Sequence, residues 1–425
     1  MNTTQYQDGE LHMEQVELKK VATAFGTPVY CYSTEQIAKN YHAWEEALSS
    51  IMPRDNFTIC YACKANSNMA VLRLLSRLGA GMDVVSGGEL YRAFRADIPT
   101  NKTVFSGVGK SKIEITRAVQ SGLLLINVES ESELDMIGEI AHQEEKPARI
   151  ALRVNPNVDA KTHAKITTGL HDNKFGIDID TAKRLYHKAS KMNGVAPVGV
   201  AVHIGSQLLD LVPYAAAYSN IAELVKELRA DGLTIDTVDL GGGLGIPYGD
   251  ETAPDFKEYA RIVAETILPL NVHIVVEPGR SIVGNAGVLL TTVMHHKKGA
   301  EKEFVIIDAG MNDLMRPALY DACHRIIPCT EPEAGATPMT ADIVGPVCET
   351  ADTFLIDAPL PANVAVGDVL AIMTSGAYGA SMSGTYNTRL LAAEVLISDR
   401  RHDQIRKVQK LEDLVGLDVI PAWLK

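Results

Sequence analysis

The sequence predicts an α/β protein that combines a (β/α)8 TIM-like barrel with a mainly β domain that follows it. Up to residue 277, eight short runs rich in β-branched residues alternate with amphipathic helical runs. These strand-like runs are apolar along their whole length, as parallel strands buried on both faces are. Beyond residue 280, strand-like runs follow one another without regular helices between them, which indicates a separate β domain.

The elements of the predicted barrel can be located individually. Ser33, with Gln36 three residues later, forms a capping box that predicts the start of the first barrel helix. Further helices are expected at 112–120, 133–143 and 220–232, the last closed by a terminating glycine. An open doubly wound sheet has the same local pattern and is the alternative to a closed barrel. The predicted strands cover residues 57–63, 81–86, 102–107, 123–128, 149–154, 197–203, 235–240 and 272–277.

We expect two domains, with the barrel at residues 34–280 and the mainly β domain formed by 1–33 together with 281–425. The run 28-PVYCYS-33 precedes the first barrel helix and is assigned to the β domain, which makes that domain discontinuous. Residues before Val16 show no recognisable role, so a frayed terminus is expected there. The predicted strands of the β domain are 288–294, 303–310, 368–374 and 393–398.

Composition and charge argue against several classes of protein. The net charge of −13 comes without a long run of one sign, which speaks against nucleic acid or an anionic membrane as the main partner. No run approaches the ~20 apolar residues of a spanning helix, and the N-terminus lacks signal-peptide features, so we expect a cytoplasmic protein. Cys60 and Cys63 could form a metal or thiol site, but their spacing on a strand favours packing, and no metal is expected.

Polar residues stand at the carboxyl ends of the predicted strands, where barrel enzymes carry their chemistry. A lysine, an imidazole ring, a glycine-rich loop and a carboxylate at neighbouring strand ends are what pyridoxal phosphate would use. Each also has an ordinary explanation: an exposed lysine, a core histidine, a tight turn, and an ion pair of Glu277 with Arg280. The strand-end groups are Lys64, Asp83, Ser86, Arg153, His203, the loop 241-GGGLG-245 and Glu277.

The sequence resembles the fold-type-III pyridoxal phosphate decarboxylases and, within them, the diaminopimelate decarboxylases. The matching motifs occur in the family's order and span nearly the whole chain. They are 61-YACKAN-66, 83-DVVSGGEL-90, 168-TGLHDNKFGI-177, 203-HIGSQ-207, 241-GGGLG-245, 277-EPGR-280, 315-MRPALY-320, 345-GPVCETAD-352 and 376-GAY-378.

The resemblance implies the cofactor pyridoxal 5′-phosphate and roles for individual residues. Lys64 would carry the cofactor as an internal aldimine, His203 would stack on its ring, and Glu277 would pair with its pyridinium nitrogen. Cys348 would protonate the carbanion after carbon dioxide leaves; an ordinary packing cysteine is the alternative. The cofactor-binding residues implied in this way are Lys64, Asp83, His203, Ser206, Gly243, Glu277, Gly279, Arg280 and Tyr378.

The resemblance also implies the substrate and the assembly. The expected reaction is decarboxylation of meso-2,6-diaminopimelate to L-lysine, the last step of lysine biosynthesis, in a head-to-tail homodimer whose 348–350 loop completes the partner's pocket. A distal carboxylate calls for arginine, although Arg316 read alone could be a surface residue. Ornithine or arginine decarboxylase, alanine racemase and a non-enzymatic homologue are the rivals. The implied substrate-binding residues are Arg280, Arg316, Tyr320, Glu349 and Tyr378.

Overall fold

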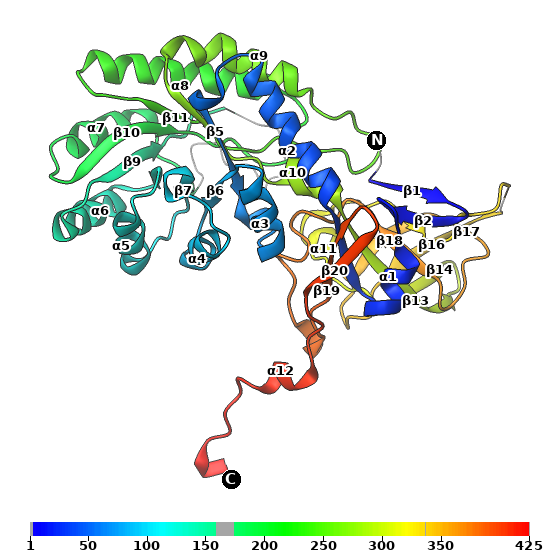
Figure 1. Cartoon of the computed structure of the whole chain (residues 1–425). Coiled ribbons are helices and arrows are strands. Elements are labelled where there is room, and N and C mark those ends of the chain that lie inside the picture. Colours follow the sequence, from blue (N-terminus) through cyan, green and yellow to red (C-terminus); the bar gives the residue numbers. More distant parts are fainter. Residues whose placement is uncertain (1–2, 159–173, 336, 425) are drawn as a thin grey trace. The chain divides into compact units, whose positions relative to one another are not determined.

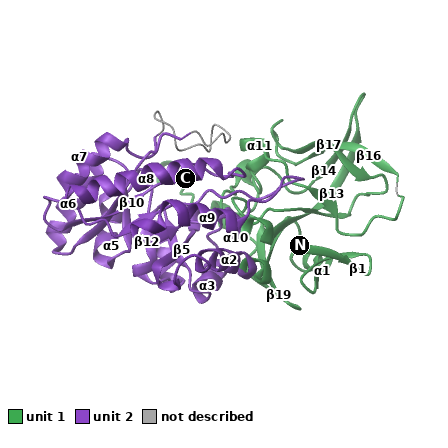
Figure 2. Cartoon of the chain, turned by 90° about the horizontal axis from the view of Figure 1, so that it is seen from above, with its two compact units in different colours: residues 1–37, 283–425 green, residues 38–282 purple. Residues whose placement is uncertain are grey.

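The structure is a computed structural model that describes residues 3–158, 174–335 and 337–424. The chain divides into two compact units, one of residues 38–282 and one of residues 1–37 with 283–425 (Figure 2). We call them the barrel unit and the β unit. Among the described residues, no helix combines the length and the apolar character needed to cross a membrane.

The barrel unit contains a closed barrel of eight parallel strands (Figure 1). The last strand pairs with the first through Ile274 and Phe57, so the sheet has no open edge. All eight predicted strands are confirmed, and closure excludes the open doubly wound alternative. The strands are β5 (Phe57–Ala62), β6 (Gly81–Val84), β7 (Thr103–Phe105), β8 (Leu125–Val128), β9 (Ala148–Arg153), β10 (Val195–Ala201), β11 (Thr237–Asp239) and β12 (His273–Val276).

Helices alternate with these strands and cover the outside of the barrel (Figure 1). The predicted first helix is confirmed as α2 (Thr34–Ser49), and the Gln36 N–H donates to Ser33 Oγ at 3.0 Å. The predicted segment 220–232 is the end of a longer helix, α8 (Val212–Ala230), which begins with Pro213 in its first turn. The other helices are α3 (Met69–Arg77), α4 (Gly87–Arg95), α5 (Lys112–Ser121), α6 (Glu131–Glu144), α7 (Ile179–Ala189), α9 (Phe256–Thr266) and α10 (Arg280–Val283).

Buried side chains pack on both faces of the barrel sheet. Inside, a buried cluster of small and branched side chains comes from six strands: Cys60, Val104, Leu125, Ala151, Ala201 and Val275. Outside, aromatic rings join three helices, with Trp44 of α2 and Tyr214 of α8 packing edge-on against Tyr259 of α9. Tyr259 also exchanges a hydrogen bond of 2.8 Å with Tyr218. These contacts fix the three helices against one another on the outside of the barrel.

The β unit is built on one sheet whose main path runs β17-β16-β14-β13-β4-β19-β20. The early run 28–33 enters it as β4 (Val29–Ser33), antiparallel to β13 and parallel to β19. The four predicted strands are present, but four others were not predicted: β15, β16, β17 and β20. The strands are β13 (Gly287–Lys298), β14 (Glu303–Ile307), β15 (Ile326–Pro328), β16 (Pro338–Val344), β17 (Thr353–Pro361), β18 (Val369–Ile372), β19 (Ala393–Ser398) and β20 (Arg401–Arg406).

The expectation of a frayed N-terminus is wrong for the described residues. Three short strands form a sheet, β1 (Thr4–Gln7), β2 (Glu10–Met13) and β3 (Val16–Glu17), and helix α1 (Leu18–Phe25) follows. Leu11 and Met13 are fully buried among core residues of the β unit. The Leu11 N–H also donates to the Cys329 carbonyl oxygen at 2.7 Å. Burial of these side chains, rather than a long strand pattern, holds the segment in place.

Tyr186 of α7 compensates for an irregularity in the barrel wall. The pairing of β9 with β10 shifts register between Pro197 and Gly199. There the buried Tyr186 hydroxyl donates to the Gly199 carbonyl oxygen at 2.6 Å and accepts from the Leu152 N–H at 3.2 Å. The hydroxyl therefore takes the place of a ladder hydrogen bond.

We predict that Tyr186→Phe lowers the free energy of unfolding by about 1–3 kcal/mol, because it leaves buried polar groups without this partner. Urea unfolding followed by circular dichroism measures the change. Tyr91→Phe, at an exposed tyrosine of α4, is the matched control and should leave the midpoint unchanged. Equal midpoints for Tyr186→Phe and the wild type would show that the hydroxyl does not stabilise the wall.

Candidate active site

A cavity of about 400 Å³ opens at the carboxyl ends of the barrel strands. Residues at the carboxyl end of each of the eight strands line it, which is the place where barrels of this kind carry their sites. Three residues predicted from the sequence, Lys64, His203 and Glu277, therefore face one space. Other polar residues of its wall are Ser106, Asn127, Arg153 and Asp239.

Lys64 lies in a single 3-10 turn, η2 (Cys63–Ala65), directly after β5. Its Nζ donates to Asp83 Oδ2 at 2.9 Å, and its side chain is 37% exposed while that of Asp83 is fully buried. The second oxygen of Asp83, Oδ1, is buried and has no hydrogen-bond partner among the described residues. Lys64 is thus a half-buried amine held at the cavity by a fixed carboxylate, and it is not the freely exposed lysine of the ordinary explanation.

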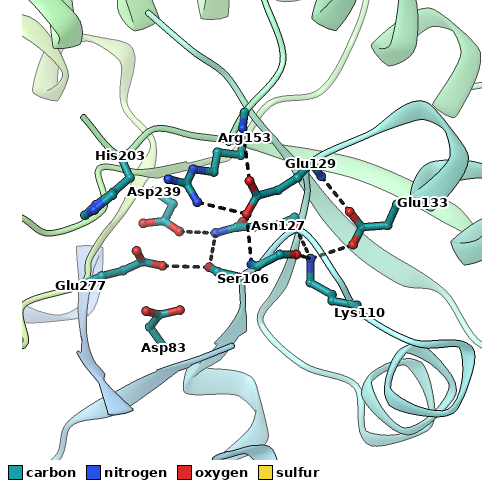
Figure 3. A network of polar contacts seen from close by, with 12 residues as sticks. Asp83, Ser106, Lys110, Asn127, Glu129, Glu133, Arg153, His203, Asp239 and Glu277 are labelled. Atoms are coloured by element: carbon teal, nitrogen blue, oxygen red, sulfur yellow. Dashed lines mark hydrogen bonds and ion pairs between the residues drawn. The ribbon is translucent and has the colours of Figure 1, made fainter. Parts of the chain in front are cut away.

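Glu277 follows β12 and is surrounded by other acids (Figure 3). Burial raises the pKa of its carboxyl well above the usual value, and the neighbouring Asp239 and Asp83 raise it further. Glu277 hydrogen-bonds to Asp239 and accepts from Ser106 Oγ at 3.4 Å. A carboxyl group in this setting holds a proton in the absence of a cation, so it suits a hydrogen bond to a ring nitrogen.

His203 follows β10, and its ring is held by the glycine loop. The Gly242 N–H donates to His203 Nδ1 at 3.2 Å, so Nδ1 is an acceptor and the ring proton resides on Nε2. Burial lowers the pKa of His203 well below its usual value, and the charges of Arg153 and Lys64 lower it further. The site therefore contains a neutral, flat imidazole.

The loop 241–245 packs backbone to backbone against the loops on either side of it. Gly241 and Gly243 have φ of +65° and +102°, a region that favours glycine. A side chain at Gly243 would overlap the Gly205 carbonyl oxygen, and one at Gly242 would overlap the Glu277 carbonyl oxygen. Only glycine fits here, so the loop lies directly against the segments that follow β10 and β12.

Arg280 links two of the predicted phosphate-binding segments. Its guanidinium donates to Ser206 Oγ at 3.1 Å and to the Tyr248 hydroxyl at 2.7 Å. The residue before it, Gly279, sits so close to β5 that an added Cβ would press on the Ala62 and Ala65 side chains. The segments that follow β10 and β12 therefore meet around the Arg280 side chain.

The remaining predicted site residues belong to the β unit. Arg316 begins the short helix α11 (Arg316–Tyr320) and is only 5% exposed, so the surface explanation for this arginine is wrong. Its Nη1 donates to His324 Nε2 at 2.9 Å, which leaves Nδ1–H of His324 to donate to the Met373 carbonyl oxygen. Tyr320 is half-buried at the end of the same helix, and Tyr378 is half-buried with a left-handed φ of 55°.

Cys348 and Glu349 lie on an exposed loop of the β unit. The Cys348 thiol is free and exposed, which excludes the ordinary explanation of a packing cysteine. Its backbone N–H donates to Asn387 Oδ1 at 2.9 Å, which ties the loop to its neighbour. A hydrogen bond from the Tyr386 hydroxyl to Glu349 raises the pKa of that tyrosine.

Sequence reasoning missed a polar network behind the cavity (Figure 3). Glu129 accepts from Arg153 Nη1 at 3.0 Å and from two backbone N–H groups, those of Gly107 and Gly176. It therefore fixes Arg153 in the cavity wall. The buried Lys110 donates to Glu133 at 2.6 Å in the same network. One signal was available: Ser130 followed by Glu133 is a capping pattern, and Ser130 does cap α6.

The first six residues of the motif 168–177 lie outside the described residues. Cys60 and Cys63 are both buried, and burial raises the pKa of both thiols. Within the described ranges, no group of three or more His, Cys, Asp or Glu side chains could hold a metal ion.

Comparison with known proteins gives consistent matches over nearly the whole chain. The family model described as pyridoxal-dependent decarboxylase, pyridoxal binding domain, matches residues 34–284. The chain is 46% identical to the diaminopimelate decarboxylase of Aquifex aeolicus over 98% of its length and 97% of that protein. It resembles the structure of the Helicobacter pylori diaminopimelate decarboxylase complexed with L-lysine with a TM-score of 0.90, at 43% identity, over 95% of this chain and 99% of that one. For the M. jannaschii enzyme in complex with L-lysine, the TM-score is 0.93 at 42% identity, over 99% of each chain.

We predict that the His203 ring stays neutral as the pH falls from about 8 to about 6, although an ordinary histidine titrates near 6.5. The reason is that burial and two neighbouring cations penalise the charged ring. NMR of ring-labelled histidines measures this, and His203→Gln identifies the signal. A His203 signal that titrates near pH 6.5 would contradict the buried, neutral ring.

Proposed function

Since this chain belongs to the pyridoxal-dependent decarboxylases, in the branch of the diaminopimelate decarboxylases, we propose that it converts meso-2,6-diaminopimelate to L-lysine and carbon dioxide. One observation carries this proposal: Lys64, His203 and Glu277, which match the family's motifs, line a single cavity at the ends of the barrel strands. The high identity to diaminopimelate decarboxylases over nearly their full length supports the same substrate.

The cofactor of this family is pyridoxal 5′-phosphate, and two features of the barrel unit fit it. The buried Asp83 Oδ1, with no partner among the described residues, can accept a further hydrogen bond. The glycine loop approaches its neighbouring segments more closely than any side chain would permit, and close backbone approach is what a phosphate cradle uses. We assign the phosphate to Gly243, Gly279, Arg280 and Ser206, together with Tyr378 of the β unit.

When bound, pyridoxal phosphate provides an electron sink for the electron pair that remains as carbon dioxide leaves. Lys64 Nζ would hold the cofactor through its aldehyde group with loss of water, and Asp83, which accepts from that nitrogen at 2.9 Å, would orient it. His203 presents its neutral ring to the flat face of the cofactor. Glu277 holds a proton at the ring nitrogen. Cys348, an exposed thiol, would supply the proton that replaces the lost carboxylate.

Substrate choice depends on the distal end of the substrate. Meso-diaminopimelate carries a second carboxylate there, whereas ornithine carries only an ammonium group. Arg316 is a buried guanidinium whose orientation is set by His324, so it is preorganised to bind a carboxylate. We assign the distal carboxylate to Arg316, with Arg280, Tyr320 and Tyr378, and the distal ammonium group to Glu349.

We further propose a homodimer with shared active sites. The family resemblance implies that the loop 348–350 completes the pocket of the neighbouring subunit. The exposure of Cys348 and Glu349 in the single chain is what a loop that completes another subunit's pocket requires. Analytical ultracentrifugation tests the assembly, and mixing Lys64→Ala with Cys348→Ala subunits tests the sharing. Partial recovery of activity in the mixture supports shared sites, and no recovery contradicts them.

We predict that Lys64→Ala abolishes carbon dioxide release from meso-diaminopimelate and removes the cofactor adduct that borohydride reduces. The reason is that Lys64 is the amine held at the cavity by Asp83. Lys112→Ala, at an exposed lysine of α5, is the control and should keep both properties. A reducible adduct at wild-type level in Lys64→Ala would overturn the assignment.

We predict that Arg316→Ala lowers kcat/KM for meso-diaminopimelate by roughly 30-fold to several thousand-fold. The loss of a charge-assisted contact to a buried carboxylate costs about 2–5 kcal/mol, and each 1.4 kcal/mol is about tenfold. Trace activity on L-lysine, which has no distal carboxylate, should be unchanged or higher.

Arg325→Ala, at an exposed arginine nearby, is the matched control for the charge change. Misfolding would depress activity on both substrates, so the ratio of the two activities is the diagnostic quantity. Equal losses on both, or no loss on meso-diaminopimelate, would show that Arg316 does not bind that carboxylate.

A further inference from the structure

Asp239, at the end of β11, lies beside Glu277 in the cavity wall, and both of its carboxylate oxygens accept hydrogen bonds (Figure 3). Asn127 Nδ2 donates to Asp239 Oδ2 at 2.8 Å, and the Gly241 N–H donates to Oδ1 at 3.0 Å. Asp239 also hydrogen-bonds to the Glu277 carboxyl. Two carboxyl groups that share a hydrogen bond must share a proton, since two carboxylates cannot donate to each other.

The surrounding donors decide which of the two acids carries that proton. Asn127 Nδ2 and the Gly241 amide are fixed N–H groups and can only donate, so they favour an ionised Asp239. Within the described part of the chain, Glu277 has one weak donor, Ser106 Oγ at 3.4 Å, which itself can turn to accept. The proton of the pair therefore belongs to Glu277, and Asp239 accepts it in a hydrogen bond.

The other charged groups that face Glu277 are Asp83 and Lys64, and these two form an ion pair with each other. The Cys60 thiol also faces the three acids, and burial keeps its pKa well above the usual value, so it adds no charge. Asp239 is accordingly the unneutralised negative charge in direct contact with Glu277.

We propose that Asp239 is a positioning residue that keeps Glu277 protonated in the cofactor-free protein. Glu277 can then donate this proton to the ring nitrogen of the cofactor. On binding, the Glu277 O–H bond breaks, its proton forms an N–H bond with the ring nitrogen, and Glu277 remains as the carboxylate partner. This proposal rests on the proposed function. It adds that the proton comes from the protein and that Asp239, a neighbouring acid in the cavity wall, maintains it.

The substitution Asp239→Asn tests this, because it removes the charge and keeps the shape. Asn127 Oδ1 is buried and has no partner within the described part of the chain, so the Asn127 amide can turn to receive the new N–H group. Infrared spectroscopy of the cofactor-free protein detects a protonated carboxyl through its carbonyl band. Glu277→Gln, which lacks that band, identifies it.

In the wild type, the Glu277 band should be present near neutral pH and should disappear when pyridoxal phosphate is added. In Asp239→Asn, the pH at which the band is half lost should fall by about one unit or more, since a neighbouring like charge has been removed. An unshifted midpoint, or no Glu277 band in the wild type near neutral pH, overturns the proposal. The wild-type measurement decides the matter even where Asp239→Asn does not fold.

Calorimetry provides a second readout that is independent of turnover. Pyridoxal phosphate is titrated into the cofactor-free protein in buffers that differ in ionisation enthalpy, which counts the protons exchanged. At a pH between the two midpoints, Asp239→Asn should take up about one more proton per cofactor than the wild type. In a protein that also carries Glu277→Gln, the substitution Asp239→Asn should not change the number of protons taken up per cofactor. Equal proton counts contradict the role of Asp239, whereas failure of the wild type to bind the cofactor contradicts the proposed function.

Discussion

The site depends on one constraint: charged groups buried at the ends of barrel strands must each obtain a partner or a proton. Three acids meet there, Asp83, Asp239 and Glu277, with Lys64 as the amine that contacts one of them. The arrangement resolves this by pairing Asp83 with Lys64, by surrounding Asp239 with fixed donors, and by leaving a proton on Glu277. The result is an amine and an acid that face one cavity in the states that the proposed chemistry needs.

The fold could be predicted where burial of both sheet faces produces a continuous apolar run. It could not be predicted at edge strands, whose sequences lack such a run. Parallel strands buried on both faces are continuous apolar runs, so all eight barrel strands were visible. By contrast, β17 carries Pro359 and Pro361, and β20 is mostly polar or charged. Both are edge strands of the β unit, where prolines and charges are tolerated. The first strands were missed because the cluster that buries Leu11 includes residues distant in the sequence, such as Val288.

The candidate site, like the fold, could be predicted only in part. Lys64, His203 and Glu277 were found because they interrupt or end apolar strands. Asp239 was not, because it lies within a predicted strand and its role depends on Asn127, which is 112 residues away. His324 was missed for a similar reason, since only the folded chain shows that it orients Arg316. Partners that act through contact across strands leave no local sequence signal.

The most direct test of the proposed function is a turnover assay of the purified wild-type protein with pyridoxal phosphate and, separately, meso-diaminopimelate, L-ornithine, L-arginine and L-lysine. Carbon dioxide and the amino product are measured together. The account predicts that meso-diaminopimelate has by far the highest kcat/KM and yields one L-lysine for each carbon dioxide. No carbon dioxide from meso-diaminopimelate, or a higher kcat/KM for L-ornithine or L-arginine with release of the corresponding diamine, would contradict it.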